Sequence, residues 1–253
     1  MTDRSIIALS GADRERFLQG LVTNDVRKVS GGIIYAALLT PQGKYLADFF
    51  IIGQPDRLLI DVATPLSATL LQRLAMYRLR ADVQITTTDL VVSRGTGPAP
   101  AGALADPRHP ALGWRLYGDR DLSDNTDWNA LRVAYLIPET GIELTPETYI
   151  LEAGFERLHG VDFRKGCYVG QEVTARMKHK TDLRKGLVPV RIEGPADPGT
   201  PILSGDREAG TLLTRAGDRA IAWLRFDRST GPLRAGTASV VADLPPAAPP
   251  QAR

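Results

Sequence analysis

The chain has 253 residues, of which 43% are apolar and 24% charged, the balance of a folded protein with one large domain or two to three small ones. The formal net charge of +2 does not predict a nucleic-acid-binding protein. One cysteine, Cys167, excludes an intramolecular disulfide and indicates a reducing compartment. The three histidines lack zinc-ligand spacing, and no run of about 18 apolar residues or signal peptide is present. We therefore expect a cytoplasmic protein without a membrane span.

The first part of the chain alternates between strand-like and helix-like patterns. Thr40-Pro41-Gln42-Gly43 predicts a hairpin turn. Ser10, three residues before Asp13, resembles a capping box for a helix that buries Leu18, and Thr64-Pro65 predicts the start of a second helix. Short apolar runs predict strands at residues 5–9, 33–39, 45–52, 58–62, 83–88 and 90–94.

The middle of the chain mixes loops and helices. Residues 95–107 are rich in Gly, Pro and Ala and predict a surface loop. Apolar residues one turn apart predict a helix over 127–136. Thr145-Pro146 predicts another helix, which ends near Gly160.

The pattern changes near residue 186 to short alternating runs separated by Gly or Asp, typical of a small antiparallel β-barrel or sandwich. The Pro-rich tail predicts disorder. We expect an α+β fold with three parts. They are a region of two interleaved subdomains at 1–185, a C-terminal antiparallel β-barrel at 186–243 and a disordered tail at 244–253.

The segment Lys165–Glu172, KGCYVGQE, has an unusual composition. Gly166 and Gly170 bracket Cys167, and glycine permits unusual backbone angles or the close approach of a ligand. Good helix formers follow Gly170, so the cysteine lies just before a helix start and beside two cations, features that lower the pKa of a thiol. The alternative is that Cys167 is a small buried residue of the core.

Charged residues give two further signals. Residues 164–185 contain seven Lys or Arg against two acids, which fits either a solvated helix face or a basic wall for an anionic ligand such as a polyglutamate tail. Asp48, Asp61 and Glu152 lie inside apolar runs. A buried carboxylate must be paired or ligand-bound, and it can accept two hydrogen bonds from the amino-pyrimidine edge of a pterin. A salt bridge to an arginine or an edge-strand acid facing water are the alternatives.

Several segments in order resemble the YgfZ family of folate-binding proteins. They are FLQGLVTNDV at 17–26, LLTPQGKYLADFFI at 38–51, YRLRADV at 77–83 and LEAGFERLHGVDFRKGCYVGQE at 151–172, with Arg176 downstream. That family is related to mitochondrial factors that act late in iron–sulfur cluster assembly. The wider superfamily includes the aminomethyltransferase of the glycine cleavage system.

The resemblance implies a GcvT-like three-part arrangement around a central tetrahydrofolate channel, with the C-terminal barrel. By position, Glu152 matches the carboxylate that holds the pterin in aminomethyltransferases. Asp48 is similar to the aspartate after the turn at 40–43, where the transferases carry paired acids. Ala47 replaces one acid of that pair, which argues against aminomethyl transfer and leaves enzymatic activity open.

The resemblance thus implies a tetrahydrofolate-binding accessory protein in iron–sulfur cluster assembly or repair, with folate (including polyglutamylated forms) and iron–sulfur proteins or their assembly machinery as partners. Alternatives are a folate-dependent one-carbon transferase and a factor linked to tRNA modification. Without an aromatic-basic RNA module, direct nucleic-acid binding is not expected, and we expect a monomer. One cysteine cannot supply four thiolates to a cluster, so another chain or a small thiol would have to contribute. The predicted site residues are Cys167 and Lys165 for the chemistry, and Asp48, Glu152, Thr23, Asn24, Tyr168, Gln171, Glu172 and Arg176 for folate, with no metal site.

Overall fold

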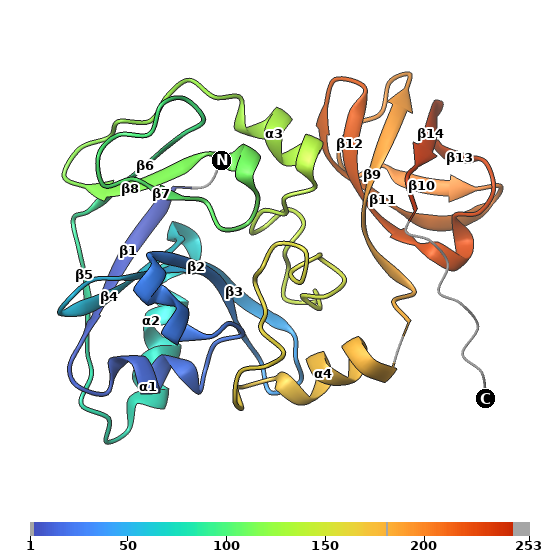
Figure 1. Ribbon diagram of the computed structural model, residues 1–253. Coiled ribbons are helices and arrows are strands. Elements are labelled where there is room, and N and C mark those ends of the chain that lie inside the picture. Colours follow the sequence, from blue (N-terminus) through green and yellow to red (C-terminus); the bar gives the residue numbers. More distant parts are fainter. Residues whose placement is uncertain (1–2, 181, 245–253) are drawn as a thin grey trace. The chain divides into compact units, whose positions relative to one another are not determined.

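The computed structural model describes residues 3–180 and 182–244, so most of the tail predicted to be disordered lies outside the described residues. The chain forms two compact units (Figure 1). Within the described chain, no helix is long and apolar enough to cross a membrane. The first unit contains the chain up to Thr126 with Thr145–Ile150 and Phe155–Ala175, and the second contains Asp127–Leu144, Leu151–Gly154 and the chain from Arg176 onward.

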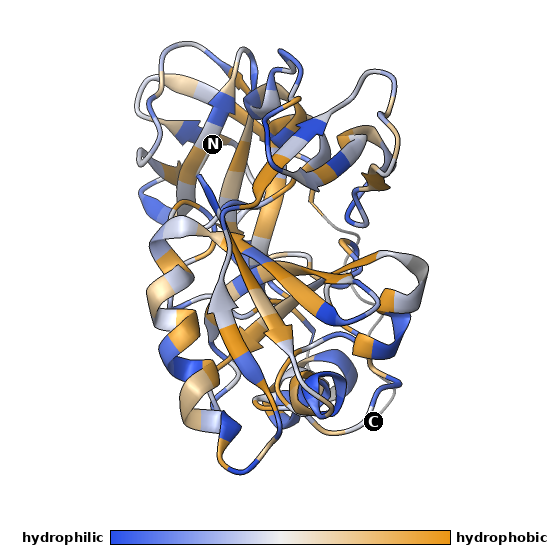
Figure 2. Ribbon diagram, turned by 90° about the vertical axis from the view of Figure 1, so that its left-hand side faces the viewer, coloured by the Kyte–Doolittle hydropathy of each residue, from blue (hydrophilic) through white to orange (hydrophobic). Residues whose placement is uncertain are grey.

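An antiparallel sheet of five strands forms the centre of the first unit, in the order β2-β3-β4-β1-β5. Its strands are largely hydrophobic (Figure 2), because they alternate between two buried faces rather than between core and solvent. The predicted strands are confirmed within one or two residues at their ends. The bounds are β1 Arg4–Ser10, β2 Ile33–Leu39, β3 Tyr45–Gly53, β4 Arg57–Ala63 and β5 Gln84–Thr87.

Two α-helices and one 3₁₀-helix accompany this sheet. Helix α1 (Arg14–Gln19) buries Leu18 as predicted, but the predicted capping box is wrong: Asp13 makes no side-chain cap, and its carboxylate accepts the backbone N–H of Asp82. Ser10 remains part of strand β1, which explains why it does not cap the helix. The 3₁₀-helix η1 spans Val26–Gly31, and α2 spans Thr64–Arg78 with proline in its first turn, as predicted.

A second, three-stranded sheet has the order β6-β8-β7, with β6 at Val91–Gly95 and β8 at Trp114–Gly118. The predicted loop at 95–107 contains the two-residue strand β7, Leu104–Ala105. A short 3₁₀-helix, η2 (Pro110–Leu112), follows it.

The helix predicted to run from Thr145 to Gly160 is absent, and turns take its place. Gly154 and His159 both have positive φ, +79° and +54°, which interrupts a right-handed helix. The segment also divides between the two units. The helix expected after Gly170 does form, as α4, Gln171–Lys180.

The second unit contains a closed six-stranded barrel, in the order β10-β11-β12-β9-β14-β13, which confirms the predicted C-terminal barrel. Helix α3 (Trp128–Tyr135) agrees with the predicted helix, and Asp127 caps it by accepting the N–H of Ala130. The barrel strands are β9 Lys185–Glu193, β10 Pro201–Ser204, β11 Arg207–Ala216, β12 Arg219–Arg225, β13 Leu233–Ala235 and β14 Ala238–Ala242, with the 3₁₀-helix η3 at Phe226–Arg228.

Candidate functional site

Hydrogen bonds from Lys165 hold the segment Lys165–Glu172 against the end of helix α1. The side chain of Lys165 is buried, and Nζ donates hydrogen bonds to the carbonyl oxygens of Gln19, at 2.8 Å, and Val22. Carbonyl groups at a helix C-terminus lack intrahelical partners, and a lysine there satisfies them. The predicted chemical role of Lys165 remains a prediction, and the structure shows its ammonium engaged with the backbone.

Burial has an electrostatic consequence for this ammonium. Loss of hydration lowers the pKa of Lys165 from 10.5 to about 8, although the nearby carboxylates of Asp25 and Asp162 act in the opposite direction. At neutral pH the group is therefore still mostly charged, and it becomes neutral under mildly alkaline conditions.

We expect the free energy of unfolding of the wild type, compared with Lys165→Met, to rise with pH between about 8 and 10.5. In this window the unfolded chain holds the lysine proton and the folded chain has released it, so raising the pH favours folding. The gap between the folded and unfolded pKa values, at about 1.4 kcal/mol per pKa unit, sets an upper limit of about 3.5 kcal/mol. Urea unfolding of both proteins at constant ionic strength measures the difference. Lys178→Met, which removes an exposed ammonium from α4, controls for the loss of charge alone. Parallel profiles for wild type and Lys165→Met would contradict the expectation.

Cys167 is exposed, two residues beyond the buried lysine. The alternative in which the cysteine is a buried core residue is therefore wrong. Gly166 beside it is also exposed, and a Cβ at that position would meet no atom within 4 Å. The thiol thus lies on an open stretch of backbone between two buried residues, Lys165 and Tyr168.

The next residues hold the segment from its other end. Tyr168 is buried, which raises its pKa to about 12, and the ammonium of Lys165 lies 5.1 Å from its ring centroid. Gly170 has φ +83°, and a Cβ there would lie 2.6 Å from the carbonyl oxygen of Thr40. The unusual backbone angle predicted for this glycine is thus confirmed, and what approaches it closely is the turn at 40–43; the approach of a ligand stays a prediction.

Helix α4 starts directly after this contact. Gln171 is half-buried at its first position, whereas Glu172 and Arg176 are exposed. Arg176 belongs to the second unit. Their predicted contact with folate remains a prediction.

Thr23 and Asn24 connect the sheet to the segment that precedes Lys165. The hydroxyl of Thr23 donates to the carbonyl of Gly160 at 2.6 Å and accepts the N–H of Ala37. The amide nitrogen of Asn24 donates to the carbonyls of Tyr35 and His159, at 2.8 and 2.7 Å. Both side chains are buried and bound to backbone, so they hold the framework of the site. Their predicted role in folate binding remains untested.

Asp25 completes this turn. It caps the 3₁₀-helix η1 by accepting the N–H of Arg27, and the Arg27 guanidinium grips both carboxylate oxygens. The side-chain hydrogen bond from Arg27 lowers the pKa of Asp25 to about 2. This carboxylate is therefore ionised at neutral pH, and it lies near enough to Lys165 to favour the charged form of the lysine.

Asp48 lies on β3, buried between two tyrosines. Tyr45 donates its hydroxyl to one carboxylate oxygen at 2.6 Å, and Tyr35 donates to the other at 2.9 Å. Burial and the negative charge of Asp48 raise the pKa of Tyr35. Each carboxylate oxygen carries two lone pairs, so the tyrosines do not exhaust its capacity to accept. No motif in the sequence pointed to these tyrosines.

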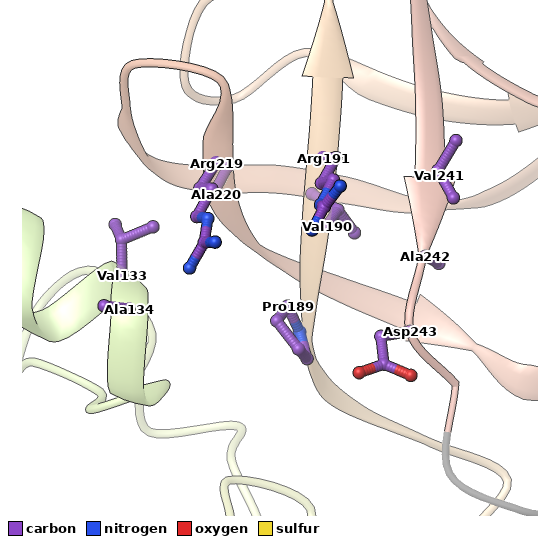
Figure 3. Close-up of a pocket in the computed structure, with 10 residues that line it drawn as sticks. All are labelled: Val133, Ala134, Pro189, Val190, Arg191, Arg219, Ala220, Val241, Ala242 and Asp243. Carbon is purple, nitrogen blue, oxygen red and sulfur yellow. The ribbon is translucent and has the colours of Figure 1, made fainter.

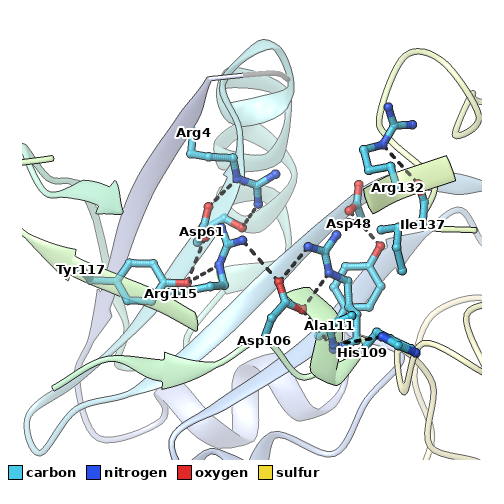
Figure 4. Close-up of polar contacts among 12 residues, drawn as sticks. Arg4, Asp48, Asp61, Asp106, His109, Ala111, Arg115, Tyr117, Arg132 and Ile137 are labelled. Atoms are coloured by element: carbon cyan, nitrogen blue, oxygen red, sulfur yellow. Dashed lines mark hydrogen bonds and ion pairs between the residues drawn. The ribbon is translucent and has the colours of Figure 1, made fainter. Parts of the chain in front are cut away.

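Asp61 has a structural environment. Arg4 and Arg115 bind its two oxygens at 2.6 and 2.5 Å, and Tyr117 donates a further bond at 3.0 Å (Figure 4). These arginines offset the burial of the carboxylate and lower its pKa to about 2. Arg115 also contacts Asp106, which pairs with Arg108. Of the readings that the sequence left open for Asp61, the salt bridge to arginine is confirmed.

Glu152 belongs to the second unit and is half-buried there. Its carboxylate lies 3.8 Å from the ammonium of Lys185, and its backbone carbonyl accepts the N–H of Leu187 at 2.9 Å. The close packing of Gly186 on the same carbonyl, where a Cβ would lie at 2.6 Å, fixes this residue at the start of strand β9. Among the described residues, no group of three or more His, Cys, Asp or Glu is placed to hold a metal ion.

Residues 184–250 match the family model for the CAF17 C-terminal beta-barrel domain. A crystal structure of aminomethyltransferase T of the glycine cleavage system from Bartonella henselae superposes with a TM-score of 0.71 at 12% identity, over 94% of this chain and 82% of that one. The likeness confirms the expected GcvT-like α+β fold, and at this identity it shows the fold alone.

Three curated relatives with similar sequences carry the same name. The iron–sulfur cluster assembly factor IBA57 of Homo sapiens is 30% identical over 91% of this chain and 78% of its own length, and that of Mus musculus is 29% identical over 92% and 79%. The homolog of Mycosarcoma maydis is 32% identical over 74% of this chain. The match spans about half of the homolog's length (55%).

These names correct two expectations. All three relatives are described as mitochondrial, which overturns the expectation of a cytoplasmic protein. They also bear the name IBA57 rather than YgfZ, so the resemblance to the YgfZ family holds only at the level of related families.

Proposed function

Because the chain belongs to the IBA57 family of iron–sulfur cluster assembly factors, we propose that it binds tetrahydrofolate and assists cluster assembly through the segment Lys165–Glu172, with Cys167 as the working group. The observation that carries the proposal is the exposure of the single cysteine on a short stretch fastened at both ends. Buried Lys165 holds one end, and Gly170 packed on the turn at 40–43 holds the other.

The cysteine count limits what the thiol does. A cluster needs about four protein or small-molecule thiolates, and this chain offers one. Cys167 therefore acts as one contributor to a cluster that a partner protein or a small thiol also ligates. An exposed thiol on a segment held at both ends suits such sharing, because the partner reaches it without unfolding this chain. The cluster is the cargo in this proposal.

Two carboxylates, Asp48 and Glu152, are separate candidates for the group that accepts hydrogen bonds from the pterin, and the contacts described for each lie within its own unit. Each is shielded from water, and each is a candidate acceptor for the amino-pyrimidine edge of a pterin. At Asp48, two tyrosine hydroxyls fix the orientation of the carboxylate before any ligand arrives. The exposed basic residues of 164–185 would meet an anionic glutamate tail.

Calorimetric titration with tetrahydrofolate and its 5-formyl and 5,10-methylene forms tests this part. We expect binding, and we expect Glu152→Gln to weaken it about 10- to 100-fold, because a charged hydrogen-bond acceptor is worth about 1.5–3 kcal/mol. Asp48→Asn should act in the same direction. Glu147→Gln, which changes an exposed glutamate, is the matched control. Equal affinities for wild type and both carboxylate variants would remove these residues from the site. No binding of any folate would remove the folate part and leave the role of Cys167 standing.

A one-carbon transferase is the less favoured function. Ala47 is buried in β3 next to Asp48, so the second acid of the transferase pair has no counterpart at this position. Aminomethyl turnover with a lipoyl carrier protein would revive this alternative. The tRNA-linked role and the monomeric state remain predictions.

A further inference from the structure

Two arginines face each other across neighbouring strands on the outside of the barrel. Arg191 on β9 is the direct register partner of Arg219 on β12, and both side chains are exposed. Directly opposed residues of an antiparallel pair lie on the same face with their Cβ atoms about 5 Å apart, so the two positive charges repel each other. Val241 on β14 is the register partner of Arg191 on its other side.

Neither guanidinium has an ion-pair or hydrogen-bond partner within the part of the chain that the structure describes. Other arginines of the same barrel are matched: Arg225 pairs with Asp227, Arg234 pairs with Asp206, and Arg215 donates to two backbone carbonyls. Asp218 and Glu193, close in sequence to the two arginines, form no ion pair with them. The pair thus keeps its repulsion uncompensated within the described chain.

The two arginines border a cavity of about 450 Å³ within the second unit, shown in Figure 3. Val133 on α3, Pro189 on β9 and Val241 on β14 give it apolar walls, and Asp243 contributes its only acidic side chain. A cavity of this size suits a small organic molecule. Its lining combines apolar side chains with two guanidinium groups and one carboxylate, which suits a ligand that has both an apolar body and a charged group.

The wall contributed by α3 is held in place. Arg132 on this helix is buried, with Glu143 at 2.5 Å and Glu139 at 2.9 Å, and Asn129 donates to the carbonyl of Arg215 on β11 at 3.0 Å. The helix therefore does not need to reorganise to accept a ligand, which reduces the entropy that binding costs.

We propose that this cavity binds a small organic anion, whose phosphate or carboxylate group bridges Arg191 and Arg219. Guanidinium groups bind the oxygens of such groups in pairs, and an anion between them removes the repulsion. The body of the ligand packs on Pro189 and Val241. Asp243 accepts a hydrogen bond from a hydroxyl or amino group of the ligand and disfavours a second anionic group. None of these residues belongs to the segment Lys165–Glu172, so this proposal does not rest on the proposed function.

Isothermal titration with inorganic phosphate and with succinate, in separate arms, tests the proposal and distinguishes phosphate from carboxylate ligands. At least one probe should bind the wild type, and the double variant Arg191→Gln/Arg219→Gln should weaken it at least about 10-fold, the equivalent of about 1.4 kcal/mol. Arg207→Gln, at an exposed arginine of β11 outside the cavity, should bind like the wild type. Absence of binding for both probes at millimolar concentration, or equal binding by the double variant, would overturn the proposal.

The melting temperature of the protein without any probe gives an independent readout. The double variant should melt at the same temperature as the wild type or higher, because it loses a like-charge contact. A clearly lower melting temperature would show that the arginines form a stabilising contact, and this too would overturn the proposal.

Discussion

Gly170→Ala is expected to lower the free energy of unfolding by about 2–5 kcal/mol. The backbone at this position has φ +83°, a region that costs a residue with a side chain about 1–2 kcal/mol. The added Cβ would also lie 2.6 Å from the carbonyl oxygen of Thr40 and 2.9 Å from the side chain of Leu39, and forcing a methyl group into such a contact costs about 1–3 kcal/mol. Urea unfolding measures the loss.

The other glycine of the same segment is the matched control. Gly166 has no positive φ, and a Cβ there would meet no atom within 4 Å, so Gly166→Ala should change stability by no more than about 0.5 kcal/mol. Equal effects of the two substitutions would mean that the packing of Gly170 on the turn at 40–43 does not hold the segment. We do not expect the turn at 40–43 to move aside for a methyl group added at Gly170. Gly43 in that turn also has a positive φ, +77°, and lies close to Val173, so the turn is packed on its other contacts as well.

Cys167→Ala is expected to abolish the ability of the protein to restore iron–sulfur enzyme activity in cells that lack it. The reason is chemical: no second cysteine in the chain can replace the thiolate. Stability should be almost unchanged, because the side chain is exposed and its removal leaves no cavity. The measurement pairs enzyme activity in cells with the melting temperature of the purified variant, which should stay within a few degrees of the wild type.

Two controls separate the thiol from the fold. Cys167→Ser keeps the shape and a polar group, and it should fail like the alanine variant, while Glu147→Gln should rescue fully. Full rescue by Cys167→Ala would exclude the thiol as the working group and turn attention to Lys165. Alkylation by iodoacetamide in the native state should be fast at the exposed thiol, and protection by folate would place the ligand beside it.

The hydrogen-bond partners of Asp48 could not be predicted from the sequence pattern. On a regular strand, Tyr45 and Asp48 are three residues apart and would point to opposite faces. The register between β2 and β3 shifts between Leu38 and Leu39. Leu38 lies opposite Ala47 and Leu39 lies opposite Tyr45, so β3 has one extra residue at this point. This bulge brings the tyrosine hydroxyl to the carboxylate, at 2.6 Å. The apolar run around Asp48 therefore indicated a carboxylate that is paired or ligand-bound, and it gave no sign of the tyrosines that bind it.

The helix prediction for residues 145–160 was wrong for a related reason. Thr145-Pro146 followed by apolar residues has the local pattern of a helix start. A prediction from the sequence alone rests on this local preference, because the tertiary contacts that oppose it are not visible there. In the folded chain the segment passes from one unit to the other and back, with residues of positive φ at 154 and 159. Contacts with each unit override a preference that is worth only a fraction of a kcal/mol per residue.

The sequence by itself determined the strands of the five-stranded sheet, the C-terminal barrel and the limit of one thiolate, because apolar runs, alternation and residue counts can be read locally, whereas it gave no sign of strands β7 and β8. Only the tertiary structure decided that Cys167 is exposed while Lys165 is buried, that Asp61 is neutralised by arginines, and that two arginines face each other across the barrel. Each of these depends on residues far apart in the chain, such as Arg191 and Arg219. Strand register, burial and the distance between charges bring such residues together, and none of them is written in a local pattern.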